Sequence, residues 1–176
     1  MAFTAMDVKA LREKTGVGMM ECKKALTEAD GDMDKAIDFL RERGLAAAEK
    51  KSARIAAEGV VYTYYDEAAK KAVTVEVNSE TDFVAKNDKF MDFVKGVART
   101  IIATAPADVE ALCATGFDGT DRTVTETLND LILAIGENMK IRRFEVMDGV
   151  VATYIHAGGS VGVMVGFDVA DESKAA

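Results

Sequence analysis

The sequence is poor in the residues from which metal sites and disulfide frameworks are built. Its 176 residues include one histidine, two cysteines and no tryptophan. A single histidine excludes a cluster of histidine ligands, and Cys22 and Cys113 lie far apart in the sequence, in no C-x-x-C arrangement. We therefore expect two reduced thiols, with an intermolecular disulfide as the alternative, and neither a metal site nor a cofactor.

The sequence also lacks long apolar runs and any concentration of positive charge. No window approaches the roughly 18 to 20 consecutive apolar residues of a membrane span, and the N-terminus has no basic and then apolar signal layout. The net charge is −8, whereas binding to nucleic-acid phosphates requires clustered basic side chains. These absences predict a cytoplasmic protein that contacts neither membrane nor nucleic acid.

Motifs of catalysis are missing as well. There is no G-x-S-x-G nucleophile motif and no G-x-x-x-x-G-K-[ST] phosphate loop, and residues 158–162 (GGSVG) are better explained as a hairpin turn. The sequence leaves open a Ser-His-Asp triad around His156, but no other motif supports it. We therefore predict no catalytic residues and no enzyme activity.

The first 44 residues have the pattern of a compact three-helix module. Thr4 is placed to cap the first helix and Asp32 the third, with glycine-containing breaks between the helices. Gly44 is expected to end the third helix, and residues 45–56, rich in alanine and lysine, to form a helical linker. The apolar positions expected at helical spacing are Val8, Leu11, Met19, Cys22, Ala25, Leu26, Met33, Ala36, Ile37 and Leu40.

From Glu58 onward the period of the apolar residues changes to two. Valines and tyrosines alternate between the two faces in residues 60–65, and valines alternate again in residues 73–77 after a polar loop. This pattern predicts an antiparallel hairpin. Residues 140–143 (KIRR) fit an alternating strand edge better than an anion contact.

Two amphipathic helices are expected beside these strands. Asn87 is placed to cap the first, which Pro106 ends, and a capping box at residues 123–126 opens the second, which Gly136 closes. Strands and helices in separate blocks predict the α+β class, with an antiparallel sheet and covering helices. Residues 57–145 form the expected first core subdomain.

The hairpin pattern occurs twice. Residues 59–64 (GVVYTY) recur 90 residues later as residues 149–154 (GVVATY), and residues 73–77 (VTVEV) recur as residues 161–165 (VGVMV). This predicts an internal duplication in which residues 146–176 begin a second, incomplete core subdomain. The apolar sheet face of that second copy must be covered by the first half, by another subunit, which allows a homodimer, or by further residues.

The second predicted strand runs directly into a turn. Residues 79–82 (SETD) fit a helix-start capping pattern, so the turn displays Asp82 beside Phe83. Base rates favour a buried phenylalanine, but a position after a strand-ending cap and beside an acid favours an exposed ring. Such a turn suits contact with a cation site of a partner better than catalysis.

A second surface candidate is the pair Met19 and Met20 beside Lys23 and Lys24. Flexible methionine side chains with a basic rim are typical of an adaptable docking patch. The alternative is that one methionine packs in the core of the helical module while the lysines are merely solvated. The sequence alone favours neither.

Four motifs resemble the bacterial elongation factor Ts family. They are residues 15–26 (TGVGMMECKKAL), 76–86 (EVNSETDFVAK), 135–143 (IGENMKIRR) and 154–163 (YIHAGGSVGV). The resemblance implies a ubiquitin-associated-like (UBA-like) module at residues 1–44. It also implies a guanine-nucleotide exchange factor that promotes GDP release from elongation factor Tu.

The same resemblance implies which residues act. Thr81, Asp82, Phe83 and Val84 match the family motif that displaces Mg²⁺ from the partner GTPase. Docking on the partner is implied for six further residues: Arg12, Met19, Met20, Lys23, Gly136 and His156.

The rival hypothesis is an interaction protein without exchange activity. Its helical module would act as an adaptor that recruits a partner, while the α+β part dimerises. Such an adaptor would bind without altering the nucleotide off-rate of its partner, whereas an enzyme would show turnover that depends on His156.

Overall fold

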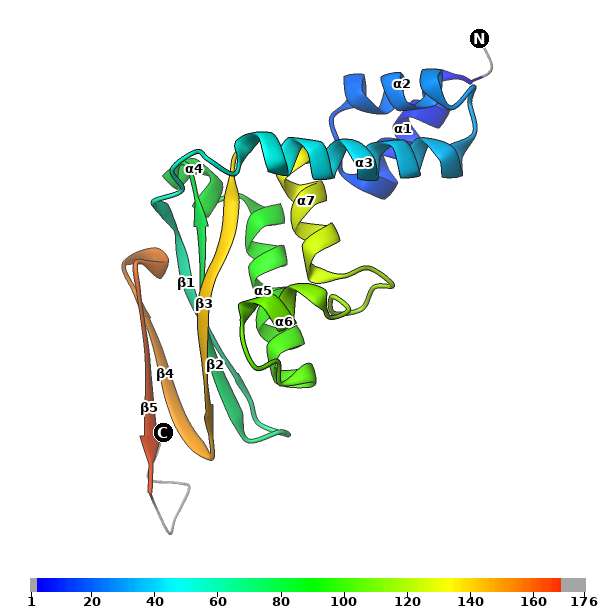
Figure 1. The fold of residues 1–176 in the computed structure, drawn as a ribbon. Helices are drawn as coiled ribbons and strands as arrows, with labels where there is room; N and C mark the ends of the chain where they lie inside the picture. The colour runs from blue at the N-terminus through cyan, green and yellow to red at the C-terminus, as the bar shows by residue number, and fades with distance from the viewer. Residues whose placement is uncertain (1–2, 169–176) are drawn as a thin grey trace. The chain divides into compact units, whose positions relative to one another are not determined.

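The computed structural model describes residues 3–168 of the chain (Figure 1). The helices and strands are α1 (Ala5–Thr15), α2 (Met19–Glu28), α3 (Met33–Lys51), β1 (Glu58–Asp66), β2 (Lys71–Ser79), α4 (Asp82–Ala85), α5 (Asp88–Thr104), α6 (Val109–Ala114), α7 (Val124–Ile135), β3 (Met139–Asp148), β4 (Val150–His156), the 3-10 helix η1 (Ala157–Gly159) and β5 (Val161–Phe167). This combination of helices with antiparallel strands confirms the α+β class.

The chain divides into two compact units. One unit runs to Arg54 and also contains Glu126–Asn138, so that most of α7 belongs with the three N-terminal helices. The other unit consists of Ile55–Thr125 and of the residues from Met139 onward, and it contains the strands.

The helix caps of the first unit follow from the sequence. Thr4 and Asp7 form a capping box at the start of α1, in which the Thr4 backbone N–H donates to Asp7 Oδ2 at 2.7 Å. Gly16 ends α1 in the left-handed region, with a φ of 71°. Asp32 caps α3 by accepting hydrogen bonds from two backbone N–H groups of its first turn. Thr4 and Asp32 therefore cap α1 and α3 as expected.

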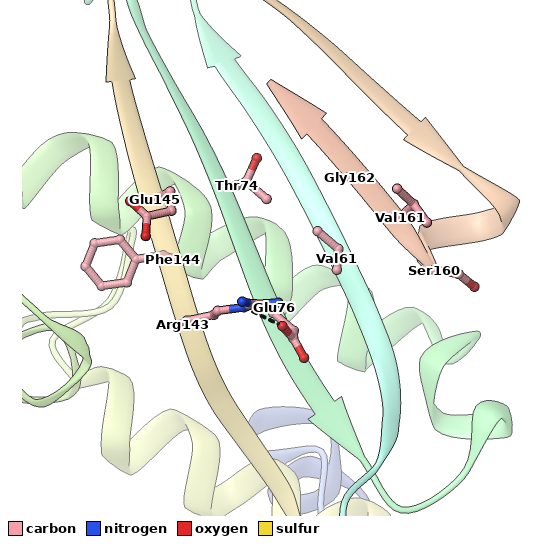
Figure 2. Close-up of a pocket in the computed structure, with 9 residues that line it drawn as sticks. All are labelled: Val61, Thr74, Glu76, Arg143, Phe144, Glu145, Ser160, Val161 and Gly162. Carbon is pink, nitrogen blue, oxygen red and sulfur yellow. Dashed lines mark hydrogen bonds and ion pairs between the residues drawn. The ribbon is translucent and has the colours of Figure 1, made fainter. Parts of the chain in front are cut away.

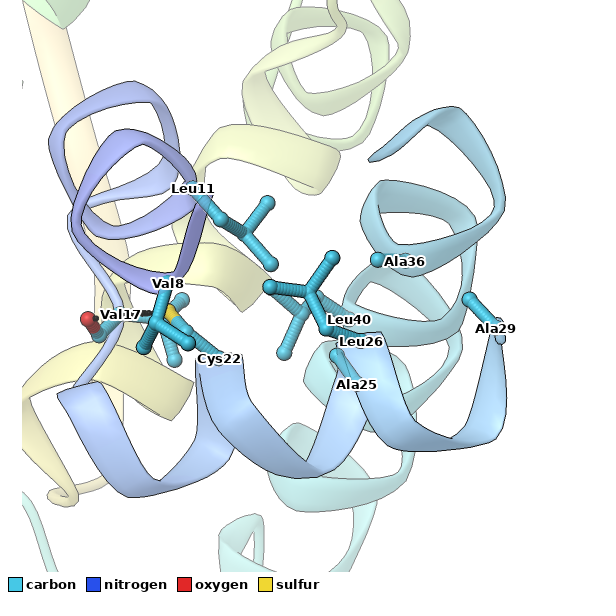
Figure 3. Packing of buried hydrophobic residues seen from close by; sticks show 9 residues of the cluster. All are labelled: Val8, Leu11, Val17, Cys22, Ala25, Leu26, Ala29, Ala36 and Leu40. Atoms are coloured by element: carbon cyan, nitrogen blue, oxygen red, sulfur yellow. Dashed lines mark hydrogen bonds between the residues drawn. The ribbon is translucent and has the colours of Figure 1, made fainter. Parts of the chain in front are cut away.

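The three N-terminal helices enclose a small apolar core (Figure 3). It consists of Val8, Leu11, Val17, Cys22, Ala25, Leu26, Ala29, Ala36 and Leu40. Cys22 is fully buried, and this burial raises the pKa of its thiol. Both cysteines are free, as expected. Leu133 of α7, in the same unit, packs against this core.

The expectation that Gly44 ends the third helix is wrong. α3 continues to Lys51, so the helical part of residues 45–56 extends α3 and ends before the strands begin. Gly44 is buried, and a Cβ at this position would lie 3.3 Å from the Asn129 carbonyl oxygen of α7. The glycine therefore allows α7 to approach α3 closely rather than marking a helix end.

The second unit is built on a three-stranded antiparallel sheet in the order β1-β2-β3. β1 and β2 form the expected hairpin, with Val60 opposite Val77 and Tyr64 opposite Val73. The odd-numbered valines of β2 are fully buried, and α5 packs on β1 and β2. Figure 1 shows α5 on one face of this sheet and the hairpin of β4 and β5 on the other.

The second hairpin packs closely on the first. β4 and β5 pair antiparallel and are joined by η1, which confirms the hairpin turn expected for residues 158–162. A Cβ at Gly162 would lie 2.5 Å from Val61 Cγ1, so β5 approaches β1 through a glycine. The first half of the core therefore covers one face of the second hairpin. The duplication itself stays a prediction.

The opposite face of the β4–β5 hairpin, which we call the outward face, is apolar. Its large exposed side chains are Tyr154, Val161, Val163, Val165 and Phe167. Because side chains alternate between the two faces of a strand, β5 places Gly162, Met164 and Gly166 inward and its valines and Phe167 outward. The homodimer that this face allows stays a prediction.

Candidate partner-docking site

The turn after β2 begins with a buried serine. Ser79 is fully buried at the end of β2, and its hydroxyl donates to the Thr81 carbonyl oxygen at 2.9 Å. The four-residue helix α4 then starts at Asp82, with Thr81 in the N-cap position. The expected capping pattern from Ser79 to Asp82 is therefore wrong, because the Ser79 hydroxyl donates to the backbone within the turn and Thr81 occupies the cap.

Val84 and Phe83 lie on different sides of α4, one buried and one exposed. Val84 is 5% exposed, and α4 packs on β1 and β2, whereas Phe83 is 80% exposed. Consecutive helical residues are turned by about 100°, so burying one favours exposing its neighbour. The expectation that the Phe83 ring is exposed is confirmed, while Val84 lies on the buried side and anchors the turn.

The turn continues directly into α5. The Asn87 backbone N–H donates to the Val84 carbonyl oxygen at 2.9 Å, and Asn87 Oδ1 accepts from the N–H groups of Lys89 and Phe90. Asn87 is therefore the α5 cap that the sequence predicts, and the fully buried Phe90 fixes the helix behind it. The turn is held at one end by a sheet strand and at the other by a long helix, so its backbone is fixed on both sides.

Asp82 is paired with a lysine of the same turn. Lys86 Nζ lies 2.8 Å from Asp82 Oδ2. The hydrogen bond and charge of Lys86 lower the pKa of Asp82, and the same contact raises the pKa of Lys86. Asp82 is therefore a carboxylate at neutral pH. Sequence reasoning missed Lys86, although an acid followed four residues later by lysine is a known helix pairing signal.

Four expected docking residues belong to the helical unit. Arg12 lies on α1, and Met19, Met20 and Lys23 lie on α2, with all four side chains exposed. Met19 is 51% and Met20 74% exposed, so the alternative in which one methionine packs in the core is wrong. The core position of α2 is taken by Cys22 instead, which leaves two adjacent apolar side chains on the surface beside basic residues.

The remaining two docking residues lie in different units. Gly136 closes α7 with a φ of 91°, and its N–H donates to the Ile132 carbonyl oxygen at 2.9 Å. His156 is exposed at the end of β4, and its Nδ1 lies 3.1 Å from the Tyr154 hydroxyl. The strand-containing unit thus holds both His156 and the turn that bears Phe83, and the helical unit holds Gly136.

A groove of about 350 Å³ lies between the sheet and the β4–β5 hairpin (Figure 2). Glu76 and Arg143 form part of its floor, with Arg143 Nε 2.7 Å from Glu76 Oε2. Thr74 also lines the floor, and Val61 and Val161 add apolar surface. Glu145 and Ser160 add polar groups, so the groove combines an ion pair with a lining of mixed polarity.

A change of register explains the basic residues beside this groove. The ladder between β2 and β3 shifts between Glu76 and Val77, so that Arg142 is left without a partner in the strand register. Its Nε lies 3.6 Å from Glu76 Oε1, and Glu76 thus pairs with both Arg142 and Arg143. The segment 140–143 forms a strand edge, as the sequence favoured.

Metal-binding and membrane-spanning features are also absent from residues 3–168. No group of three or more His, Cys, Asp or Glu side chains there could hold a metal ion. No helix in the same range is both long enough and apolar enough to cross a bilayer. The distinctive features are exposed apolar side chains displayed on fixed backbone: Phe83 in one unit, Met19 and Met20 in the other. The chain is thus an α+β protein that exposes apolar side chains on short helical and turn elements.

The comparison with protein families agrees with the motifs. A family model described as Elongation factor TS matches residues 80–176, which begins at the turn that bears Phe83. The chain belongs to the elongation factor Ts family, whose members are elongation factors of protein biosynthesis.

Related proteins are similar over nearly the whole chain. Elongation factor Ts of Clostridium perfringens (strain SM101 / Type A) is 56% identical over 164 residues, 92% of this chain and 54% of the relative. Elongation factor Ts of Trichlorobacter lovleyi is 53% identical over 169 residues, 94% of this chain and 54% of the relative. Elongation factor Ts of Clostridium novyi (strain NT) is 52% identical over 174 residues, 97% of this chain and 57% of the relative. The chain spans a little over half the length of these curated relatives.

Proposed function

We propose that this chain is a guanine-nucleotide exchange factor that promotes GDP release from elongation factor Tu in the cytoplasm. The observation that carries the proposal is the 80% exposed ring of Phe83 on a turn fixed between β2 and α5. Removing such a ring from water favours association, and a rigid turn loses little conformational entropy when it binds. Membership of the elongation factor Ts family supports the same function.

In the proposed mechanism the Phe83 ring wedges between helices of the GTPase and shifts the ligands of its Mg²⁺ ion. Loss of Mg²⁺ exposes the charge repulsion around the diphosphate and so speeds GDP release. Asp82 brings a carboxylate to the same region. Thr81 and Val84 hold the turn, Thr81 at the N-cap of α4 and Val84 in contact with the sheet side.

The contacts outside the Phe83 turn contribute to the affinity for the GTPase and do not themselves displace its Mg²⁺. Arg12, Met19, Met20 and Lys23 form the proposed docking surface of the UBA-like helical unit, and all are exposed. Gly136 and His156 are proposed as further contacts. We expect the whole interface to bury at least the standard ~1,600 Å². Coupling between two ligands of one protein is reciprocal. Bound nucleotide must therefore lower the affinity of the GTPase for this chain by the same factor by which the chain lowers the affinity of the GTPase for nucleotide.

The test is the release of labelled GDP from purified elongation factor Tu, with and without this chain. We expect the chain to accelerate release in proportion to its concentration until the GTPase is saturated. Excess Mg²⁺ should oppose the acceleration, because the proposed intermediate lacks the ion. Binding without any change in the GDP off-rate would overturn the proposal and support the adaptor hypothesis.

The outward face of the β4–β5 hairpin favours a second candidate, a dimerising interaction protein. The side chains of this face carry no carboxylate, lysine or arginine, so two copies can meet on it without burying like charges. Light scattering across a concentration series should then show a mass rising from 18.9 kDa toward twice that value. A constant monomer mass contradicts this candidate, and a dimer that leaves GDP release unchanged favours it over exchange.

A further inference from the structure

Tyr154 and His156 form a polar pair on the outward face of the second hairpin. They are two residues apart on β4, so their side chains leave the strand on the same face. The Tyr154 hydroxyl lies 3.1 Å from His156 Nδ1, and the ring centroids are 6.0 Å apart. The pair is exposed, with Tyr154 61% accessible.

The strand pairing fixes the position of both rings. Tyr154 lies opposite Val163 and His156 opposite Val161 in the β4–β5 ladder. Directly opposed side chains of an antiparallel pair are in contact distance, so each ring is flanked by a valine. The tyrosine hydroxyl is therefore presented to the imidazole from a regular strand rather than from a mobile loop.

The chemistry of the pair selects one form of the imidazole. A phenolic O–H is a stronger donor than a neutral ring N–H, and the lone pair of an imidazole nitrogen is a stronger acceptor than a phenolic oxygen. The favoured arrangement has the Tyr154 hydroxyl donating to Nδ1 of His156. A neutral imidazole that accepts at Nδ1 carries its proton on Nε2, and that N–H remains free to donate.

We propose that Tyr154 is a positioning residue that holds His156 in the Nε2–H form and orients this N–H toward the partner GTPase. The inference rests on the proposed function, in which His156 contacts the partner. Tyr154 is the first residue of the motif at residues 154–163, but it is not among the residues to which the resemblance assigns a partner contact.

The first test reads the imidazole directly and needs no partner. The chain contains one histidine, so the ¹⁵N resonances of its ring are assigned without ambiguity. In mildly alkaline buffer, we expect Nδ1 and Nε2 of the unmodified chain to resonate far apart, as in a fixed Nε2–H form. In Tyr154→Phe the two resonances should move toward each other, because the imidazole then exchanges between the form with its proton on Nε2 and the form with its proton on Nδ1. Tyr65→Phe, which also removes an exposed phenolic hydrogen bond, to the Gly149 carbonyl, should leave the spectrum unchanged.

Identical spectra for Tyr154→Phe and the unmodified chain would overturn the proposal. So would a spectrum of the unmodified chain with the proton on Nδ1. Neither outcome depends on whether the chain exchanges nucleotide, so failure of this inference is distinguishable from failure of the proposed function.

The second test uses the GDP release assay. We expect Tyr154→Phe to raise the concentration needed for half-maximal release by about 2- to 10-fold, the worth of one exposed hydrogen bond, with the rate at saturation unchanged. His156→Gln, whose amide N–H can reach the place of Nε2, should retain more activity than His156→Asn, whose amide reaches only the place of Nδ1. Equal activity of these two variants, or full activity of Tyr154→Phe, would contradict the proposal.

Discussion

Replacement of Phe83 by alanine should slow stimulated GDP release while leaving the fold intact. Phe83 is 80% exposed, so only about a fifth of its surface is removed from water by folding. A fully buried phenylalanine costs about 3–5 kcal/mol when truncated to alanine, so a fifth of that is below about 1 kcal/mol. For a chain of this length, that corresponds to a fall in the unfolding midpoint of less than about 4 °C.

The effect on exchange should be much larger. Burying a phenylalanine side chain in a partner contributes about 1.5–3 kcal/mol, and about 1.4 kcal/mol is a tenfold change. If the ring is buried only in the complex, the Phe83→Ala variant should therefore show stimulated release about 10- to 150-fold weaker. Phe83→Leu keeps an apolar side chain of smaller area, so its stimulated GDP release should lie between that of the unmodified chain and that of Phe83→Ala.

The neighbouring residue offers a matched control. Val84 is 5% exposed, so Val84→Ala removes buried methyl groups and should cost about 1.5–2.5 kcal/mol of unfolding free energy. Thermal unfolding followed by circular dichroism and labelled GDP release, measured on both variants, give the comparison. Phe83→Ala should affect release far more than stability, and Val84→Ala should do the reverse.

Two results would refute this reasoning. A loss of stability in Phe83→Ala as large as that in Val84→Ala would mean that the ring supports its own fold. Unchanged stability together with unchanged GDP release would mean that the exposed ring has no part in exchange, and that the docking surfaces alone account for it.

The remaining predictions concern the ion pair of α4, a helix cap and the packing of the hairpins. Lys86→Met should free the Asp82 carboxylate and slow GDP release at most a few-fold, and the difference from the unmodified chain should shrink as salt is raised, because the lost pair is exposed. Hydrogen bonds from the backbone of Lys35 and Asp34 lower the pKa of Asp32 in the folded chain below 3.8. The contribution of this carboxylate to the free energy of unfolding is therefore complete above about pH 4 and is lost as the pH falls through the pKa of Asp32 in the folded chain. Asp32→Asn, which keeps an acceptor at the cap, should remove that part of the acid dependence, measured as unfolding midpoint against pH. Gly162→Ala should destabilise the strand-containing unit by about 1–3 kcal/mol, because the new Cβ would lie 2.5 Å from Val61 Cγ1, and Val61→Ala should restore much of the loss.

The sequence predicts the helices and strands better than it predicts their ends. Capping residues such as Thr4 and Asn87 act on the backbone next to them, so their effect is visible in a local pattern. Gly44 shows the limit of such patterns. Its backbone lies against α7 some 85 residues later in the chain, and no local rule distinguishes a glycine that admits a neighbour from one that ends a helix.

The candidate site shows a similar division. The exposure of Phe83 follows from the position of the turn after a strand, and the structure confirms it. The hydrogen bond of Ser79 and the pairing of Asp82 with Lys86 were not predicted, because several donors and acceptors in the turn are close enough in sequence to pair. Choosing among them requires the direction of each side chain, which the burial of Val84 sets.

The arrangement of these residues separates contact from stability. Two of the proposed contact residues have a buried residue close by in the chain: Val84 lies beside Phe83, and Cys22 lies within one helical turn of Met19. The buried neighbour fixes the backbone, so the exposed side chain needs no interactions of its own to keep its place. Selection for partner binding can therefore act on the exposed residue without affecting folding. It follows that substitutions at the exposed residues should change exchange and leave stability nearly constant, while substitutions at their buried neighbours should lower stability first and exchange only in proportion to the unfolded fraction.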